Sequence, residues 1–180
     1  MDMFEGVGRR SDATRGSFLD IGQHGLNGRE RKCLFRNNGD GTFTDVGWVE
    51  GVDGMEDGRG LAVVDYDRDG RPDLVVRNYR QPAVVLRNRL AGGHWLELKL
   101  TGTRSNRDAV GAVVRVRTGA RWQMRVVAAG SAYLSQSSLV QHVGLGPATR
   151  ADEVAIAWPS GTTQRLVDVA GDRRLAVTEP

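Results

Sequence analysis

Short apolar runs separated by turn residues fill the chain from Cys33 onward. The runs recur about every eight to twelve residues, a spacing that is typical of sheet proteins. The chain also holds 24 glycines against 5 prolines, which favours many tight turns over a helical bundle. From residue 94 onward, no segment keeps a helical period for more than about two turns. The pattern therefore predicts an all-β protein.

A propeller-blade-like antiparallel sheet is expected over residues 33–90. Its first two strands flank the sequence Asn37-Asn38-Gly39-Asp40-Gly41, and asparagine and glycine tolerate the positive φ angles of a hairpin turn. Its next two strands flank an acidic loop. The expected strands of this sheet span residues 33–36, 42–46, 60–64, 74–77 and 84–87.

A small β-sandwich or open barrel is expected over residues 91–180. Its first strand alternates, because one face carries Trp95 and the other carries Leu96, Leu98 and Leu100. A second hairpin is expected around the turn Thr118-Gly119-Ala120. The expected strands span residues 94–100, 113–117, 122–128, 139–143, 154–158, 164–167 and 175–178.

The sharpest chemical signal is the sequence Asp65-Tyr66-Asp67-Arg68-Asp69-Gly70-Arg71-Pro72-Asp73. Alternate aspartates place hard carboxylate oxygens inside a tight loop, and Gly70 permits a sharp reversal. Oxygen-only ligation in a flexible loop favours Ca²⁺ over zinc and over magnesium. We expect Asp65, Asp67 and Asp69 to bind through their side chains. Arg71 is expected to bind through its backbone carbonyl, and Asp73 directly or through water.

The alternative interpretation of this loop is an acidic turn that is only solvated. Four like charges so close in the chain repel one another unless a cation neutralises them, and this repulsion favours the metal site. The glutamate that closes the calcium loop of helical hands is replaced by Val76, and the flanking runs are strand-like. The loop is therefore predicted to be a strand–loop–strand calcium site.

Several segments resemble a known family. The sequence Leu34-Phe35-Arg36-Asn37-Asn38-Gly39-Asp40-Gly41-Thr42-Phe43, followed by the aspartate loop, resembles one FG-GAP/VCBS repeat, the blade unit of integrin-like propellers. Residues 94–178 resemble the ASPIC/UnbV domain that follows such repeats in the cartilage acidic protein family. The segments that match are Ser105-Asn106-Arg107-Asp108-Ala109-Val110-Gly111-Ala112, Ala129-Gly130-Ser131-Ala132-Tyr133-Leu134-Ser135-Gln136, His142-Val143-Gly144-Leu145-Gly146 and Trp158-Pro159-Ser160-Gly161.

The resemblance implies that Asp65, Asp67, Asp69 and Asp73 are calcium ligands, because every position of the family's motif is filled. It also implies secreted, extracellular-facing proteins, and it carries over no catalytic residue. Family members usually hold enough repeats to close a propeller, whereas this chain holds one. We therefore expect either the C-terminal piece of a larger protein or a reduced form whose blade packs on the sandwich or on a partner.

Three further side chains are candidate functional residues. Cys33 is preceded by Arg31 and Lys32, which favour a thiolate, but it begins an apolar run in which a free cysteine is commonly buried and inert. His94 and His142 lie in different expected strands without a carboxylate at fixed spacing, so structural roles are expected for both. A single cysteine also excludes an intrachain disulfide.

Charge and hydropathy limit the partners. The formal net charge of +3 comes from 25 basic and 22 acidic residues, and the arginines are interleaved with acids. A nucleic-acid binder would gather its positive charge on one face, so no nucleic-acid partner is expected. No apolar run approaches the length of a membrane span. Residues 1–32 are polar, and we expect them to form an irregular arm that is extended over 18–21. They lack the pattern of a secretory signal, so the chain as written is expected to be cytoplasmic.

Two classes of function follow. The first is a calcium-binding, non-catalytic module that binds an unidentified protein or ligand and can form a homo-oligomer through the blade, because a lone repeat leaves apolar faces uncovered. The alternative is an enzyme or accessory protein of bacterial specialised metabolism with a pocket between blade and sandwich. A cavity shared by several of Cys33, His94, His142 and Tyr133 would favour the enzyme, and their dispersal would favour the module.

Overall fold

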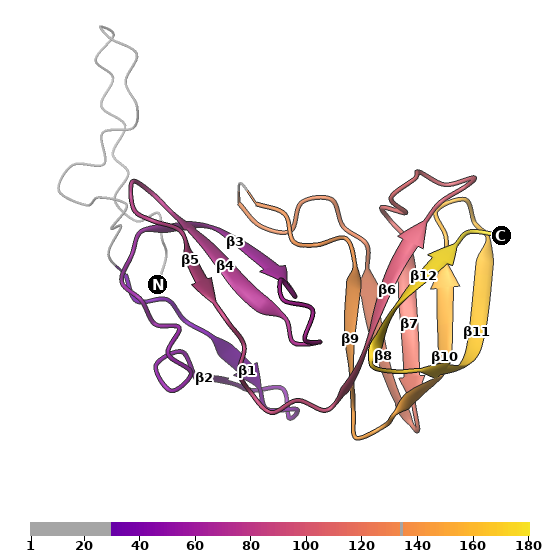
Figure 1. Cartoon of the computed structure of the whole chain (residues 1–180), viewed down its shortest axis with the longest axis horizontal. Helices are drawn as coiled ribbons and strands as arrows, with labels where there is room; N and C mark the ends of the chain where they lie inside the picture. Colours follow the sequence, from indigo (N-terminus) through magenta and orange to yellow (C-terminus); the bar gives the residue numbers. More distant parts are fainter. Residues whose placement is uncertain (1–29, 134) are drawn as a thin grey trace, which may run out of the picture. The chain divides into compact units, whose positions relative to one another are not determined.

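The computed structural model describes residues 30–133 and 135–180, which form strands and loops without a helix (Figure 1). The prediction of an all-β protein is thus confirmed over this part of the chain. The extended piece expected at 18–21 lies outside the described residues, as does nearly all of the expected arm. None of the described residues belongs to a helix with the length and apolar character needed to traverse a membrane.

The chain divides into two compact units. The first holds the described residues up to Gly58 together with Asn78–Pro82, and the second holds Arg59–Arg77 and Ala83–Pro180. The strands expected in one blade are therefore distributed over both units. The aspartate loop and the whole expected sandwich lie in the second unit, which also carries both sites described below.

A two-stranded hairpin dominates the first unit. Strands β1 (Phe35–Asn37) and β2 (Phe43–Asp45) pair antiparallel, with Asn37 opposite Phe43. In the turn, the Asn37 side-chain oxygen accepts a hydrogen bond from the Gly39 amide at 2.8 Å, and Gly39 has a φ of +85°. The hairpin that the Asn-Asn-Gly sequence predicted is therefore present, and Asn37 serves the turn itself.

A lysine organises the loops of the first unit. The Nζ atom of Lys32 donates hydrogen bonds to the carboxylate of Glu56 at 2.6 Å and to the carbonyls of Gly54 and Glu56 at 3.1 and 3.0 Å. The amide of Tyr79 donates to the carbonyl of Asp57 at 2.7 Å, which ties the segment 78–82 to the segment 54–57. Glu56 is thus a structural partner of a lysine.

Three strands of the second unit surround the aspartate loop. Strands β3 (Gly58–Val64), β4 (Asp73–Asn78) and β5 (Val84–Leu86) form a sheet in that order. β4 and β5 pair antiparallel, with Leu74 opposite Leu86. The aspartate loop connects β3 to β4, so the expected strand–loop–strand arrangement is present.

Seven further strands build a sandwich of two open sheets, neither of which closes into a barrel (Figure 1). One sheet has the order β12-β6-β9, in which β6 (His94–Thr101) pairs parallel with β12 (Arg173–Thr178) and antiparallel with β9 (Gln141–Gly146). The other is antiparallel with the order β11-β10-β7-β8. Its strands are β7 (Val113–Thr118), β8 (Arg121–Val126), β10 (Arg150–Ala157) and β11 (Thr163–Ala170).

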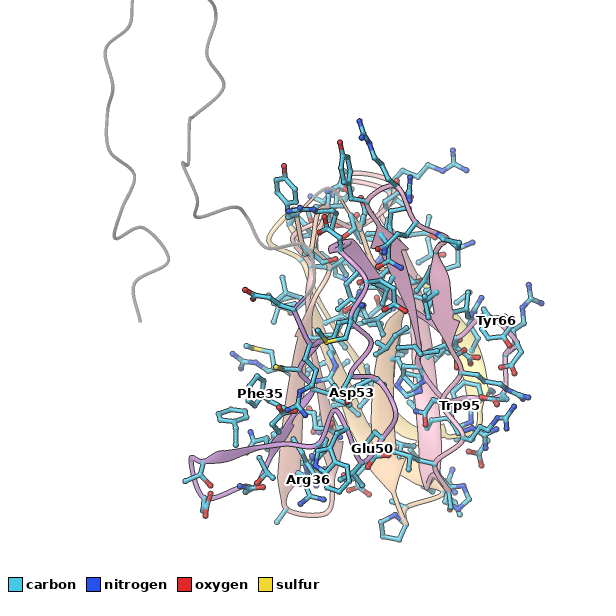
Figure 2. The ribbon with its side chains drawn as sticks, turned by 90° about the vertical axis from the view of Figure 1, so that its left-hand side faces the viewer. Phe35, Arg36, Glu50, Asp53, Tyr66 and Trp95 are labelled. Atoms are coloured by element: carbon cyan, nitrogen blue, oxygen red, sulfur yellow. The ribbon has the colours of Figure 1, made fainter. Side chains whose placement is uncertain are left out.

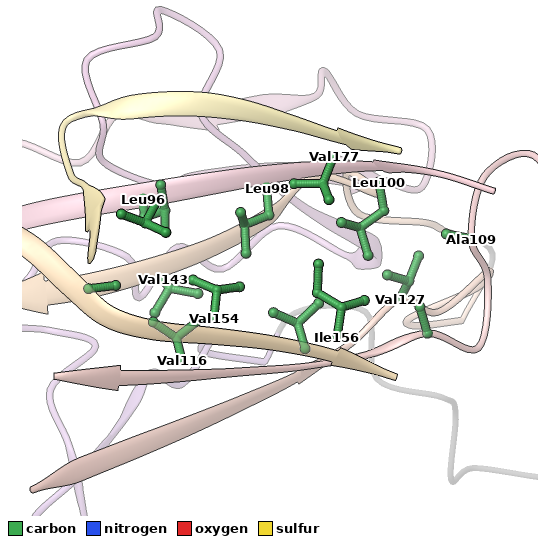
Figure 3. Packing of buried hydrophobic residues seen from close by; sticks show 14 of the residues in the cluster. Leu96, Leu98, Leu100, Ala109, Val116, Val127, Val143, Val154, Ile156 and Val177 are labelled. Atoms are coloured by element: carbon green, nitrogen blue, oxygen red, sulfur yellow. The ribbon is translucent and has the colours of Figure 1, made fainter. Parts of the chain in front are cut away.

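The hydrophobic core lies between these two sheets. Leu96, Leu98 and Leu100 project from β6 toward Val154 and Ile156 of the opposite sheet (Figure 3). All five side chains are at most 6% exposed, which confirms the alternation predicted for this strand. Each such side chain stabilises the fold by about 1.5–3 kcal/mol through removal of apolar surface from water.

Glu179 joins three segments at one end of the sandwich. One oxygen of its carboxylate accepts hydrogen bonds from the amides of Thr103, Arg104 and Ser105 at 2.7–2.8 Å. The other accepts from the hydroxyls of Ser105 and Ser160. Burial by itself would raise the pKa of Glu179, but hydrogen bonds from the Ser105 amide and from the two hydroxyls outweigh it and lower the pKa to about 2.

We predict that Glu179→Gln lowers the melting temperature by several degrees at pH 7, because an amide cannot accept all of these hydrogen bonds. The folded pKa of about 2 lies below the ordinary value of 4.5. The stabilisation by the ionised carboxylate is therefore complete above about pH 4.5 and is lost as the pH falls toward 2. The difference in melting temperature between Glu179→Gln and wild type should therefore shrink on acidification. Thermal unfolding at pH 7 and pH 3 measures both effects.

The matched control is Asp108→Asn, since Asp108 is an exposed carboxylate in the neighbouring loop. This variant should have the same melting temperature as the wild type at both pH values. Equal melting temperatures for Glu179→Gln and wild type at pH 7 would contradict the role given to Glu179.

Candidate metal centre

The aspartate loop makes a tight reversal between β3 and β4. Arg68 and Gly70 both have positive φ angles, of +61° and +85°, and these bend the chain so that alternate side chains turn inward. Tyr66 takes the opposite direction, projects away from the ribbon (Figure 2) and is 53% exposed. The loop thus has an acidic inner side and a solvated outer side.

Three carboxylates converge on the inner side. Asp65, Asp67 and Asp73 each offer an oxygen atom, and these atoms all lie within 4.8 Å of one another. Asp73 is completely buried. A buried carboxylate close to two others is unfavourable unless hydrogen bonds or cations compensate the negative charge.

Backbone amides hold two of these carboxylates in place. The oxygens of Asp65 accept hydrogen bonds from the amides of Asp69 at 3.1 Å and Gly70 at 2.8 Å. The oxygens of Asp73 accept from the amide of Tyr66 at 3.2 Å and from that of Asn88, beyond β5, at 2.8 Å. The loop therefore fixes both carboxylates before any ligand binds.

Two arginines compensate the other two aspartates. The Arg87 guanidinium lies 2.6 Å from the carboxylate of Asp67 and 3.3 Å from that of Asp69. Asp69 also accepts hydrogen bonds from the amide of Arg71, at 3.0 Å, and from its guanidinium. Asp67 raises the pKa of Arg87. Burial raises the pKa of Asp69, but the hydrogen bonds from Arg71 outweigh it and leave that pKa below its ordinary value.

The predicted ligand set is thus divided. Asp65, Asp67 and Asp73 share one locus, whereas the Asp69 carboxylate is occupied by Arg71 and Arg87. Ligation by Asp69 and by the Arg71 carbonyl remains a prediction.

The three converging carboxylates fit a hard cation. Calcium takes oxygen ligands at about 2.3–2.6 Å, so two ligands of one ion lie at most about 5 Å apart. The three oxygens satisfy this limit. The donors are carboxylates without nitrogen or sulfur, a set that suits calcium better than zinc. Carbonyls and water would complete the six to eight ligands that calcium takes.

Strands of the sandwich support the loop at Gly70. The ring nitrogen Nε2 of His142, on β9, lies 2.8 Å from the Gly70 carbonyl oxygen. A Cβ atom at Gly70 would lie 1.9 Å from the indole nitrogen of Trp95, on β6. Trp95 and His142 stack with ring centroids 6.1 Å apart and planes inclined by 13°. Gly70 is therefore required both by its φ angle and by its contact with Trp95.

Serine side chains cover the outer edge of β3. The hydroxyl of Ser135 accepts a hydrogen bond from the Leu61 amide at 3.1 Å and donates to the Leu61 carbonyl at 2.8 Å. The hydroxyl of Ser137 accepts from the Val63 amide at 3.1 Å. Serines at alternate positions thus take the place of a neighbouring strand, which protects the edge from pairing with another chain.

Comparisons with known proteins agree with this geometry. A family model described as an FG-GAP-like repeat matches residues 15–76, which include the aspartate loop. A second model, described as ASPIC and UnbV, matches residues 102–180. The chain joins an FG-GAP-like repeat to an ASPIC/UnbV domain. The resemblance noted in the sequence is thus confirmed.

Curated relatives carry the same name. The chain is 32% identical over 137 residues to Cartilage acidic protein 1 of Mus musculus, a match that covers 72% of this chain and 21% of the relative. It is 48% identical over 50 residues to Cartilage acidic protein 1 of Xenopus tropicalis and of Homo sapiens, with 27% of this chain and 8% of each relative covered. The matched part is therefore a minor share of these relatives' length.

The three candidate residues outside the loop of the FG-GAP-like repeat lie in different surroundings. Cys33 is exposed, and its sulfur lies 3.7 Å from the Arg31 carbonyl oxygen. The expectation of a buried cysteine is wrong, because β1 begins only at Phe35 and belongs to an exposed two-stranded hairpin. His142 supports the loop. His94 lies 2.6 Å from the carboxylate of Asp172.

Sequence reasoning missed Asp172 and the roles of Trp95, His142 and the serines. The His94–Asp172 contact spans 78 residues, and the His142–Gly70 contact spans 72. No local spacing announces such pairs. The sequence offered only an indirect sign of these roles, because His94 and His142 both lie in the region that resembles the ASPIC/UnbV domain.

We predict that Arg87→Gln strengthens calcium binding by about two- to fivefold, because Arg87 competes with a cation for Asp67 and a partly exposed ion pair is modest. Titration calorimetry of the variant and wild type measures the change. Arg89→Gln is the matched control, since Arg89 is an exposed arginine two residues further along the chain. Weaker binding by Arg87→Gln would instead mean that Arg87 helps to assemble the site.

Proposed function

We propose that this chain is a calcium-binding, non-catalytic interaction module. The observation that carries the proposal is the convergence of Asp65, Asp67 and Asp73 in the loop of an FG-GAP-like repeat. Calcium would draw the three carboxylates together and remove their mutual repulsion. The loop and the strands that support it would then form a stiff platform for a partner.

The positions of the candidate catalytic side chains favour a binding role over an enzyme. Cys33 lies exposed in the first unit, and Tyr133 is 74% exposed. His94 and His142 line one cavity of the second unit, and no serine, threonine, cysteine or lysine lies among the described residues that line it. Its described lining thus lacks the hydroxyl, thiol and amine side chains that many enzymes use as nucleophiles.

A protein partner is supported by apolar side chains on the first unit. Phe35, Phe43 and Trp48 are between 60% and 66% exposed, and Phe35 belongs to a hairpin strand (Figure 2). Exposed aromatic residues are typical of protein contact surfaces. We propose that a second copy of the chain covers this hairpin.

The proposed calcium site also bears on location. Modules with dissociation constants of about 0.1–1 mM work where calcium is abundant, outside the cell. We therefore propose that the protein works outside the cell. The resemblance to secreted proteins supports this location.

Calcium should raise the melting temperature, because an ion that binds the folded loop alone stabilises it by mass action, by about 2.7 kcal/mol at a hundredfold excess over the dissociation constant. Asp67→Ala should abolish most of this shift. Differential scanning fluorimetry in millimolar calcium and in chelator, with titration calorimetry, measures both effects. The proposal fails if the wild type melts at one temperature in both conditions.

Glu50→Ala is the matched control for this experiment. Glu50 is an exposed carboxylate in the first unit, so its removal should leave the calcium-dependent shift unchanged. Glu56 would serve less well, because its carboxylate pairs with Lys32. Equal loss of calcium binding in Glu50→Ala and Asp67→Ala would place the site elsewhere.

Self-association is tested by sedimentation velocity at tens of micromolar protein. We expect a dimer or a reversible monomer–dimer equilibrium, and we expect Phe35→Ser with Phe43→Ser to shift the protein to monomer. A compact wild-type monomer that binds no apolar dye would contradict the proposed contact.

A further inference from the structure

A cavity of about 520 Å³ lies beside the aspartate loop, within the second unit. The loop contributes Asp69 and Arg71 to its wall, β6 contributes His94 and Trp95, and β8 contributes Arg121 and Gln123. Cavities of about 300–1,000 Å³ hold small molecules. This one is distinct from the calcium locus, because Asp65, Asp67 and Asp73 do not line it.

Two glycines of the cavity wall differ in the space beside them. Gly93 packs so closely on the backbone of β9 that a Cβ atom there would lie 2.2 Å from the Gly146 carbonyl oxygen. Gly144 is the opposite case, since a Cβ atom at that position would meet nothing within 4 Å. The wall at Gly144 therefore lacks a side chain only because glycine has none. A larger residue at this position would place its side chain in free space.

The polar groups of the cavity are held in fixed positions. His94 Nδ1 lies 2.6 Å from the Asp172 carboxylate, so Nε2 is the ring nitrogen left for a ligand. Gln123 donates its amide to the Gly144 carbonyl at 2.7 Å, which leaves its side-chain oxygen as an acceptor. Trp95 lies against the stacked ring of His142 and offers apolar surface. Fixed donors and acceptors beside an aromatic ring suit a hydroxylated ring compound.

One arginine of the cavity wall has no ion-pair partner among the described residues. Among the described residues that line it, Asp69 pairs with Arg71, and Asp172 pairs with His94. Arg121 also lines the cavity, is exposed and forms no ion pair in the described part of the chain. The Arg121 guanidinium is therefore left for a ligand, and guanidinium is the group that binds carboxylates most specifically.

We propose that this cavity binds a carboxylated sugar of the uronic acid class. The carboxylate pairs with Arg121, and the ring hydroxyls bond to His94 and Gln123. The apolar face of the sugar rests on the aromatic rings. The site goes beyond the proposed calcium function and does not depend on it.

The test uses glucuronate as probe and a ¹H–¹⁵N NMR titration of the full chain in chelator, so that its outcome is independent of calcium binding. We expect saturable shifts of the Trp95 indole and of the Gly93 and Gly146 amides, with a dissociation constant of about 0.1–1 mM. Glucose, which lacks the carboxylate, should bind at least about tenfold more weakly.

Two variants locate the ligand. Arg121→Gln should weaken glucuronate binding by about tenfold or more, whereas Arg107→Gln, at an exposed arginine outside the cavity, should leave it unchanged. Gly144→Val should abolish binding by filling the cavity while the thermal unfolding stays cooperative, because the site has room for the side chain.

Three results would overturn the proposal. The first is the absence of chemical-shift changes at a glucuronate concentration tenfold above a dissociation constant of about 1 mM. The second is equal binding of glucose and glucuronate, which would remove the role of Arg121. The third is binding of inorganic phosphate as tight as that of glucuronate, which would reduce the site to a surface contact for any anion.

Discussion

The burial of Leu96, Leu98 and Leu100 fixes strand β6, and the surroundings of both sites depend on this strand. With its inner face committed to the core, its outer face places Trp95 beneath Gly70 of the aspartate loop. The parallel pairing of β6 with β12 brings the far end of the chain alongside it, so that buried Glu97 meets Arg174 at 2.6 Å. The same pairing brings His94 next to Asp172.

Negative charge is the constraint on the aspartate loop. Backbone amides stabilise Asp65 and Asp73, while Arg71 and Arg87 neutralise Asp69 and Asp67. This arrangement lets the loop hold its shape while three carboxylates remain close enough to share a cation. The two arginines thus occupy carboxylates that a cation would otherwise use.

Polar side chains in the segments that match the ASPIC/UnbV domain serve the fold. Ser105 and Ser160 hold Glu179, and Ser135 covers the edge of β3. Asn106 closes its own loop through two hydrogen bonds of 2.8 Å with the backbone of Val110. These polar side chains satisfy backbone groups and the buried carboxylate of Glu179, which explains their place in the pattern.

The sequence by itself determined the all-β class, nearly every strand, both hairpins and the aspartate loop, because these follow from local alternation and turn chemistry. Strands β10 and β11 begin before the predicted apolar runs because backbone pairing extends past them, whereas β1, β2 and β5 are shorter than predicted. Only the tertiary structure decided that Cys33 is exposed, that Asp69 faces arginines and that His142 supports Gly70. The contact of His142 with Gly70 joins residues far apart in the chain, and no local pattern encodes such a contact.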